Sequence, residues 1–238
     1  MVPLLLVVFQ RLGYTNLDLV FHVATATSLA VIVPTSMMST WTHARNGYVR
    51  WRQVLAMTPG GILAVHLASV VAMESAGATM ITAFGILLIF VSIQMIFLTP
   101  APRETTPAIP SWAVYLLIGI LSGGISYFFG IGGGIAAVPL LVLLAGSSIH
   151  QAVGTSSSLI VFLALYGTLR NATLGEGFAE LPGFSLGFIN LLAAACMMPT
   201  SILFARVGAN LAHRARGTLL RRLFGALLAL EGFRLALG

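Results

Sequence analysis

Charge of either sign is scarce in this sequence. Only 8% of the 238 residues are charged, whereas a typical soluble domain carries about 25%. Hydrophobic residues make up 58% of the chain. Because so few charges do not cover a water-soluble body of this size, the composition excludes an ordinary soluble domain.

Cysteine is almost absent and lysine is absent. Cys196 is the single cysteine and lies in an apolar segment, which excludes a disulfide framework or a cysteine-rich metal site. All 12 basic residues are arginine. The formal charge of +6 would suit nucleic acid, but the arginines gather at the ends of apolar segments, as membrane orientation signals do. We therefore expect no nucleic-acid partner, no metal and no cofactor.

Long apolar stretches are abundant. Five of them contain no Asp, Glu, Lys or Arg: 19–41, 54–73, 75–99, 149–169 and 181–205. Each has the roughly 20 residues that a helix needs to cross about 30 Å of hydrocarbon. A sixth stretch, 223–237, is weaker because it contains Glu231 and Arg234. The pattern predicts an all-α, polytopic membrane protein.

Parts of the chain resemble one another. VPLL at 2–5 recurs at 138–141, HVATATS at 22–28 resembles HQAVGTS 128 positions later, and GYVRW at 47–51 resembles GFINL 140 positions later. Chance similarity between apolar helices is the alternative, but the matches share Pro, Gly and His positions and keep their order. We predict two repeated halves, residues 1–98 and 112–238, joined by a linker at 99–111. Duplicated halves are typical of secondary transporters.

The first half is predicted to be incomplete at its N-terminus. Met1 aligns with Ala137, so the region 112–136 has no counterpart before it. We expect a misassigned start codon or a truncated gene, with a genuine short form as the alternative.

The uncharged segment 111–148 is too long for one crossing, since a straight helix of this length would span about 55 Å. Its middle holds Gly130, Gly132, Gly133 and Gly134, followed by Pro139. Glycine and proline both weaken a helix. Non-helical backbone at membrane depth persists only where protein or a water-filled cavity satisfies it. We therefore predict a broken helix at these glycines that lines a cavity.

The arginines favour a hairpin at this break. If every segment crosses once, the arginines divide six against six between the two faces. If 111–148 is a hairpin of two half-helices, one face holds nine: Arg45, Arg50, Arg52, Arg103, Arg206, Arg214, Arg216, Arg221 and Arg222. This second division obeys the positive-inside rule. It predicts two halves of opposite orientation, with the basic loops after Trp41 and Ala205 in the cytoplasm.

Three groups of residues are candidates for binding a solute. The first is the glycine group with Pro139, because amide donors at helix N-termini attract anions; close helix packing is the alternative. The second group is a set of hydroxyl-bearing residues, Thr155 and Ser156 with their repeat equivalents Thr27 and Ser28. Such hydroxyls line one site, or they bond to their own backbone.

The third group is a pair of histidines, His22 and His150, which are also repeat equivalents. An intramembrane histidine suggests proton coupling or an anion contact, while an interfacial position needs no function. No Asp or Glu lies near the centre of a confident crossing. A cation site would need a carboxylate at that depth. The backbone donors, the hydroxyls and the surplus of arginine therefore favour a small anion.

The quoted strings together resemble a known family. GIGGGIAAVPLLVLLAG at 130–146, HQAVGTSSSLIV at 150–161 and HVATATSLAVIVPTS at 22–36 are similar to the sulfite exporter (TauE/SafE) family of membrane transporters. The likeness covers essentially the whole chain. It implies a duplicated, multi-pass cell-membrane protein that exports sulfite, sulfonates or other small organosulfur anions. By position, the family's motifs fall on the glycine group with Pro139, on Thr155 and Ser156, and on Thr27 and Ser28.

These observations lead to one functional hypothesis and two alternatives. The hypothesis is a secondary transporter of a small anion in the inner or plasma membrane, and not an enzyme. The alternatives are an intramembrane enzyme that uses Ser or His, and a non-transporting membrane assembly factor. The sequence does not indicate the oligomeric state.

Overall fold

A computed structural model describes residues 1–74, 111–175 and 181–214 continuously, together with separate residues between 79 and 93 and between 222 and 233. Its helices are α1 (Val2–Arg11), α2 (Leu17–Arg45), α3 (Trp51–Met73), α5 (Trp112–Phe129), α6 (Gly134–Leu143), α7 (Ile149–Leu174) and α8 (Leu191–Arg214). Five of them, α2, α3, α5, α7 and α8, are long and apolar enough to cross a membrane. The prediction of an all-α, polytopic membrane protein is confirmed.

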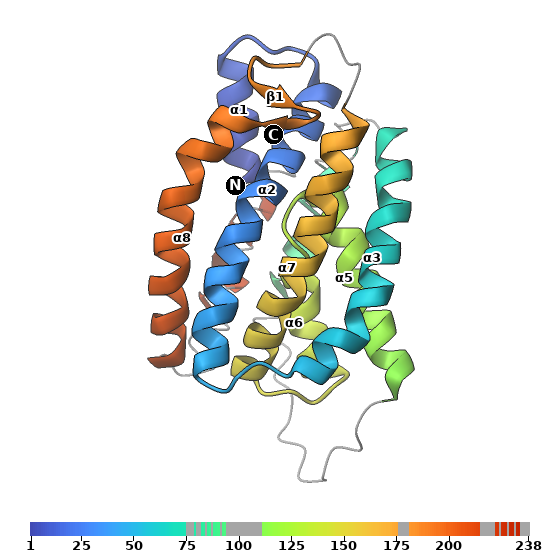
Figure 1. The fold of residues 1–238 in the computed structure, drawn as a ribbon, viewed down its shortest axis with the longest axis vertical. Coiled ribbons are helices and arrows are strands. Elements are labelled where there is room, and N and C mark those ends of the chain that lie inside the picture. Colours follow the sequence, from blue (N-terminus) through green and yellow to red (C-terminus); the bar gives the residue numbers. More distant parts are fainter. Residues whose placement is uncertain are drawn as a thin grey trace.

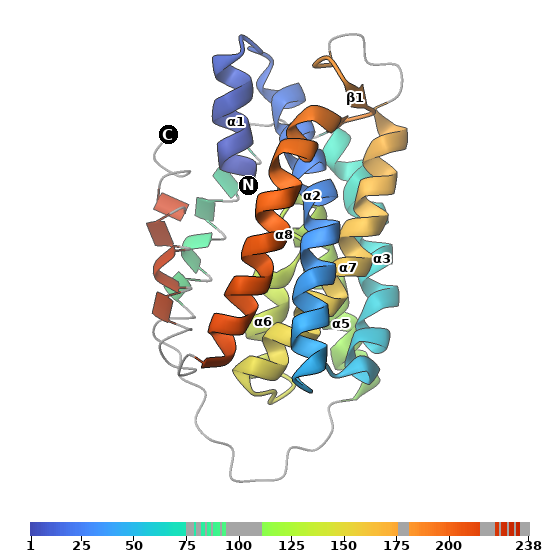
Figure 2. The same cartoon turned by 60° about the vertical axis from the view of Figure 1, so that its left-hand side comes forward.

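The helices form one bundle with two long helices at its centre. Helix α2 packs along α7, α8 packs against α2, and α3 packs against both α7 and α5. Figure 1 shows this order, with α8 beside α2 and with α5 and α3 beyond α7, and Figure 2 shows α8, α2, α7 and α3 in the same sequence from another side. The short helices α1 and α6 pack on α2 and α7, respectively. The buried middle of the bundle is therefore made by α2, α7 and the α5–α6 pair.

Segment 111–148 is a hairpin. Helix α5 ends at Phe129, and α6 starts at Gly134 and packs back against it. The start of α5 lies near the start of α3, because Gln53 donates from Nε2 to the Tyr115 hydroxyl at 3.1 Å. The start of α7 lies at the same end, because the rings of His150 and Tyr48 are 5.5 Å apart. The predicted break and reversal are confirmed.

Helices α3 and α5 approach each other closely along a line of glycines. A methyl group added at Gly60 would come within 2.7 Å of the Leu116 carbonyl oxygen. One added at Gly119 or Gly123 would overlap the backbone of Met57 or Gly61. Small residues that let backbones touch are a common device for joining helices in membranes. We call this contact the glycine seam.

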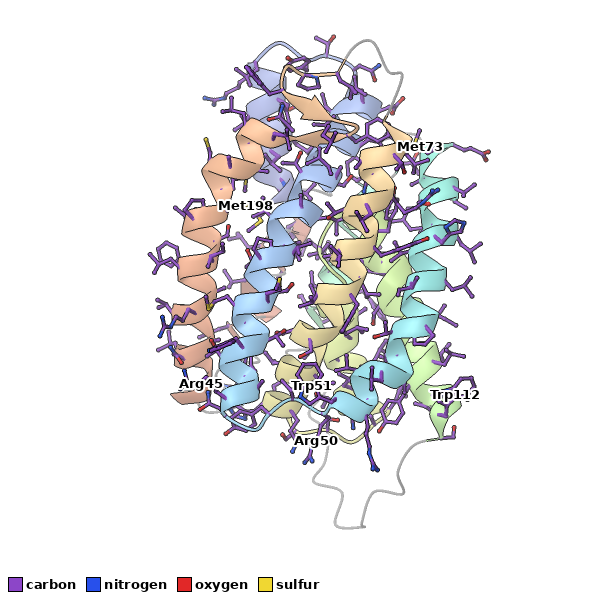
Figure 3. The ribbon with its side chains drawn as sticks, in the orientation of Figure 1. Arg45, Arg50, Trp51, Met73, Trp112 and Met198 are labelled. Atoms are coloured by element: carbon purple, nitrogen blue, oxygen red, sulfur yellow. The ribbon has the colours of Figure 1, made fainter. Side chains whose placement is uncertain are left out.

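The two ends of the bundle differ in composition. Trp41, Trp51 and Trp112 are all exposed, and Figure 3 places Trp51 and Trp112 with Arg45 and Arg50 at its lower end. The Arg45 guanidinium lies 6.0 Å from the ring centre of Trp41. Tryptophan beside arginine is typical of a membrane–water interface. We call this the tryptophan end, and the opposite end, which carries the two strands, the strand end.

The apolar stretch 181–205 is not one helix. Residues 185–190 form two short antiparallel strands, β1 (Ser185–Leu186) and β2 (Ile189–Asn190), with Ser185 opposite Asn190. Gly187, at φ +54°, makes the turn between them. Helix α8 begins only at Leu191, capped by the Asn190 side chain, which accepts from the Ala193 N–H at 2.9 Å.

The order α1–α2–α3 is followed later by α6–α7–α8, as two related halves would require. Helix α8 packs on α2 and helix α3 packs on α7, so an outer helix of each predicted half contacts the other predicted half. The linker at 99–110 lies outside the described residues. The duplication and its boundaries remain predictions.

Candidate functional site

The helix break lies at the centre of the bundle. Gly130, Gly132 and Gly133 adopt φ values of +59°, +78° and +78°, a region that side chains with a Cβ enter only at a cost. All three are buried. A methyl group on Gly132 would lie 2.7 Å from Ile160 and 3.1 Å from Ile32, residues near the middle of α7 and α2. Glycine is therefore required by both backbone conformation and space.

Helix α2 holds one side of the break. The Ser28 hydroxyl donates to the carbonyl oxygen of Gly130 at 2.7 Å. A methyl group on Gly130 would come within 2.8 Å of the Thr25 Cα atom. Ser28 is 1% exposed. The structure thus brings the predicted residue Ser28 to the glycine group, in the role of fixing the backbone at the end of α5.

The other side of the break is the N-terminus of α6. Gly133 is its N-cap residue, and the Gly133 carbonyl oxygen accepts from the N–H groups of Ala136 and Ala137. Within the described part of the chain, no acceptor pairs with the N–H groups of Gly133, Gly134 or Ile135. Unpaired N–H groups at a helix N-terminus carry partial positive charge. This end of the break can accept an anion.

Two serines next to Gly133 were not predicted. Ser122 and Ser126 lie one turn apart on α5, and each is 0% exposed. A methyl group on Gly133 would come 2.5 Å from the Ser122 carbonyl oxygen and 3.3 Å from the Ser126 Cβ atom. Neither hydroxyl has a hydrogen-bond partner among the described residues. Their spacing of four within the run SGGIS was the signal in the sequence.

The predicted threonines hold helix ends. Thr27 on α2 accepts from the N–H of Asn190, just before α8, at 3.0 Å. Thr155 on α7 accepts from the N–H of Arg50, just before α3, at 3.1 Å. Thr27 and Thr155 are equivalent in the predicted repeat, and so are Asn190 and Arg50. The two hydrogen bonds are therefore reciprocal between the predicted halves.

The predicted histidines also make reciprocal contacts between the predicted halves. The ring of His22 lies 5.5 Å from that of Phe188 at an interplanar angle of 31°. The ring of His150 lies 5.5 Å from that of Tyr48 at 32°. Phe188 and Tyr48 are also equivalent in the predicted repeat. We call His22, Thr27, Phe188 and Asn190 the α8 clamp, and His150, Thr155, Tyr48 and Arg50 the α3 clamp.

The structure therefore places the predicted site residues in different parts of the bundle. Gly130, Gly132, Gly133, Gly134 and Ser28 meet at the break. His22 and His150 belong to clamps at opposite ends of the bundle. Ser156 donates to the Val153 carbonyl oxygen of its own helix at 3.0 Å, and Pro139 is buried inside α6.

A polar cluster extends from the break toward the strand end. The Tyr127 hydroxyl donates to Oδ1 of Asn171 at 3.0 Å, and both residues are buried. Arg170 donates from Nε and Nη2 to the Ser69 hydroxyl, each at 3.2 Å. Because Tyr127 is in the last turn of α5, this cluster begins three residues before the first glycine of the break.

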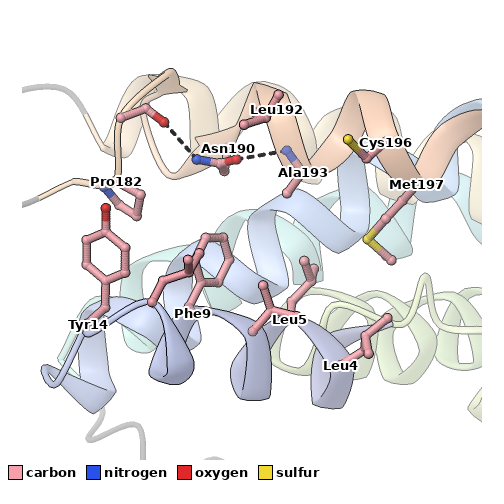
Figure 4. A pocket seen from close by; sticks show the side chains of 13 residues that line it. Leu4, Leu5, Phe9, Tyr14, Pro182, Asn190, Leu192, Ala193, Cys196 and Met197 are labelled. Carbon is pink, nitrogen blue, oxygen red and sulfur yellow. Dashed lines mark hydrogen bonds between the residues drawn. The ribbon is translucent and has the colours of Figure 1, made fainter.

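A separate crevice of about 430 Å³ lies between α1 and α8. Figure 4 shows Leu4, Leu5 and Phe9 facing Met197 across it, with Asn190 at its edge. Among the described residues, no Asp, Glu, Lys, Arg or His side chain lines it. None of the break residues lines it, so this crevice is distinct from the site at the break.

Known proteins resemble this chain along most of its length. A probable membrane transporter protein of Haemophilus influenzae is 28% identical over 211 residues, which cover 89% of this chain and 79% of that protein. One of Xylella fastidiosa is 30% identical over 71% of this chain and 64% of its own length. One of Methanocaldococcus jannaschii is 22% identical over 97% of this chain and 84% of its own. The likeness to these three relatives supports a membrane transporter.

No solved structure matches the chain. The family model of the sulfite exporter TauE/SafE matches residues 1–235. The resemblance that the glycine and threonine–serine motifs indicated is therefore confirmed. The chain belongs to the sulfite exporter TauE/SafE family.

Proposed function

We propose that this protein is a secondary transporter that exports a small anion, namely sulfite, a sulfonate or another organosulfur anion, across the cell's inner or plasma membrane. The observation that carries the proposal is the break at mid-bundle, where α6 begins with the N–H groups of Gly133 and Gly134, which have no acceptor in the described part of the chain. Discontinuous helices whose N-termini point at an anion are a common substrate site in secondary transporters.

The distribution of charge supports an anionic solute. Within the described helices, the acidic residues are Asp18, in the first turn of α2, and Glu74, at the end of α3. Neither position is at the level of the break, which lies beside Ile32 and Ile160. The described residues supply this site with N–H and O–H donors and with no carboxylate, which favours acceptors of hydrogen bonds and disfavours cations.

The two clamps suggest how the solute would pass. Each joins the N-terminus of one outer helix, α8 or α3, to a central helix of the other predicted half. Because the clamps lie at opposite ends of the bundle, opening one and then the other would expose the break alternately. We propose that the halves are inverted repeats and that they rock in this way, as such repeats do in other transporters.

The decisive experiment is flux into proteoliposomes that contain the purified full chain. We expect saturable uptake of labelled sulfite or of a labelled small sulfonate, with competition between the two. Absence of saturable flux for all these anions, in protein shown to be folded, would contradict the proposal. Chemical conversion of the probe without net movement would instead support the enzymatic alternative.

Proton coupling is tested in the same vesicles. An imposed pH gradient should drive uphill movement of the labelled anion if a proton is the coupling ion. The matched control is the same gradient collapsed by a protonophore. Equal flux with and without the gradient would remove the proton from the proposal.

A further inference from the structure

Two buried hydroxyls of α5 have no hydrogen-bond partner among the residues that the structure describes. Hydroxyls in helices ordinarily donate to the carbonyl oxygen one turn earlier. Thr25 and Ser158 do so, at 3.0 and 3.1 Å. Ser122 and Ser126 do not, although both are fully buried. An unsatisfied buried polar group costs free energy comparable to a lost hydrogen bond, so two of them side by side call for an explanation.

Their position supplies one. Gly133, the N-cap residue of α6, packs directly against Ser122 and Ser126. The N–H groups of Gly133 and Gly134 have no acceptor among the described residues. Two O–H donors and the positive end of a ten-residue helix therefore lie together. Such a set of neutral donors is complementary to a group that only accepts hydrogen bonds.

We propose that Ser122 and Ser126 are solute-contacting residues, which donate hydrogen bonds to the oxygen atoms of an oxyanion held at the N-terminus of α6. This assignment rests on the proposed transport function and names the chemistry of its site. The ligand class is an anion with several oxygen acceptors, such as sulfite or a sulfonate head group. A halide offers no separate oxygens to two hydroxyls and should bind less well.

The arrangement also predicts how specificity arises. The donors are hydroxyl and backbone N–H groups, so the contact depends on the placement of acceptor atoms more than on net charge. Ser28 is excluded from this role because its hydroxyl already donates to Gly130. The hydroxyl oxygens of Thr27 and Thr155 instead contact the main chain just before α8 and α3, from which each accepts a hydrogen bond.

The test compares Ser122→Ala and Ser126→Ala with Ser158→Ala in proteoliposomes. Ser158 is a matched control because it is also buried, but its hydroxyl bonds to Gly154 of its own helix. We expect the half-saturation concentration for labelled sulfite to rise roughly tenfold in each α5 variant, the usual effect of losing one hydrogen bond to a charged group. Ser158→Ala should leave it within about twofold.

Stability separates contact from structural support. Ser122→Ala and Ser126→Ala break no hydrogen bond within the described fold, and alanine favours helix more than serine does. We expect an unchanged or raised Tm in detergent without ligand. Added sulfite should raise the Tm of the wild type but not that of the double variant, a readout independent of flux.

The outcomes are distinguishable. Wild-type flux with unchanged half-saturation in both α5 variants would overturn the assignment and leave the transport function standing. A fall in ligand-free Tm in both variants would assign the hydroxyls to the fold and overturn it as well. A wild-type protein without saturable sulfite or sulfonate flux would overturn the proposed function, and this assignment with it.

Discussion

The α8 clamp and the α3 clamp join the same kinds of atoms at opposite ends of the bundle. Their threonine hydroxyls accept at 3.0 and 3.1 Å, and their paired rings lie 5.5 Å apart in both. Their surroundings differ, because Asn190 is buried whereas Arg50 is exposed. Loss of the threonine acceptor should therefore destabilise the protein less at Arg50 than at Asn190, because water can replace the acceptor of an exposed N–H group more easily than that of a buried one.

The largest expected effect concerns which face each clamp occupies. In a Cys196→Ser background, Asn46→Cys lies in the loop before the α3 clamp and Leu186→Cys in the turn before the α8 clamp; both positions are exposed. Because the two loops are at opposite ends, an impermeant maleimide applied to intact cells should label Leu186→Cys and leave Asn46→Cys unlabelled. Inside-out vesicles should reverse the result.

The hairpin adds a control to this labelling. Ser111, just before α5, is exposed and lies at the tryptophan end. Like Asn46→Cys, Ser111→Cys should therefore stay unlabelled in intact cells and be labelled in inside-out vesicles. Labelling of Leu186→Cys and Asn46→Cys from the same side would contradict the opposite placement of the clamps.

The next effect separates the two glycine turns that precede the clamps. A methyl group added at Gly187 (φ +54°) would overlap the carbonyl oxygens of Asn171 and Ala172. A methyl group added at Gly47 (φ +73°) would have nothing within 4 Å. We expect Gly187→Ala to lower the free energy of unfolding by about 3 kcal/mol, from backbone strain and overlap. Gly47→Ala should cost about 1 kcal/mol, from strain alone.

This difference is measured as the Tm in detergent and as the yield of monodisperse protein. Gly183→Ala serves as the control, because Gly183 has open space and an ordinary φ. Equal loss of Tm for the two turn variants would show that strain, and not contact with α7, determines the effect.

A smaller effect is expected at the threonines. Thr27→Val leaves the buried N–H of Asn190 without an acceptor and should cost about 2 kcal/mol. Thr155→Val affects the N–H of the exposed residue Arg50 and should cost about 1 kcal/mol. The Tm values report both, and the Thr→Ser variants, which keep the hydroxyl, should remain close to wild type. A larger loss at Thr155 would contradict the ranking by burial.

The smallest effect is expected at the histidines. His22→Phe and His150→Phe keep an aromatic ring against Phe188 and Tyr48, and ring contacts are maintained by any aromatic pair. We expect sulfite half-saturation within about twofold of wild type for both. Loss of gradient-driven uptake in either variant, with folding intact, would instead assign that imidazole to proton coupling.

Much of this architecture could be predicted from the sequence because the bilayer imposes strong patterns. Charge-free runs indicated the crossings, and the glycines at 130–134 indicated the break. The strands at 185–190 were missed because Leu181 to Ala205 reads as one apolar run, although Pro182 and Gly187 interrupt it.

The site was predicted less completely because a side chain's partner is not visible in the sequence. Thr155 and Ser122 are both hydroxyl residues in apolar segments, yet one accepts from Arg50 and the other has no partner in the described fold. Equivalent positions in a repeat suggested one shared lining. In the inverted arrangement that we propose, however, equivalent residues near helix starts lie at opposite ends of the bundle, as His22 and His150 do.

The glycine seam has a mechanical consequence. Where Gly119 and Gly123 touch Met57 and Gly61 through their main chains, no side chains are interposed that could change rotamer to permit sliding. Helices α3 and α5 should therefore move together as one rigid body. Since α5 leads into the break, a displacement of the N-terminus of α3 at the membrane surface would displace the break at the centre of the bundle by a similar amount.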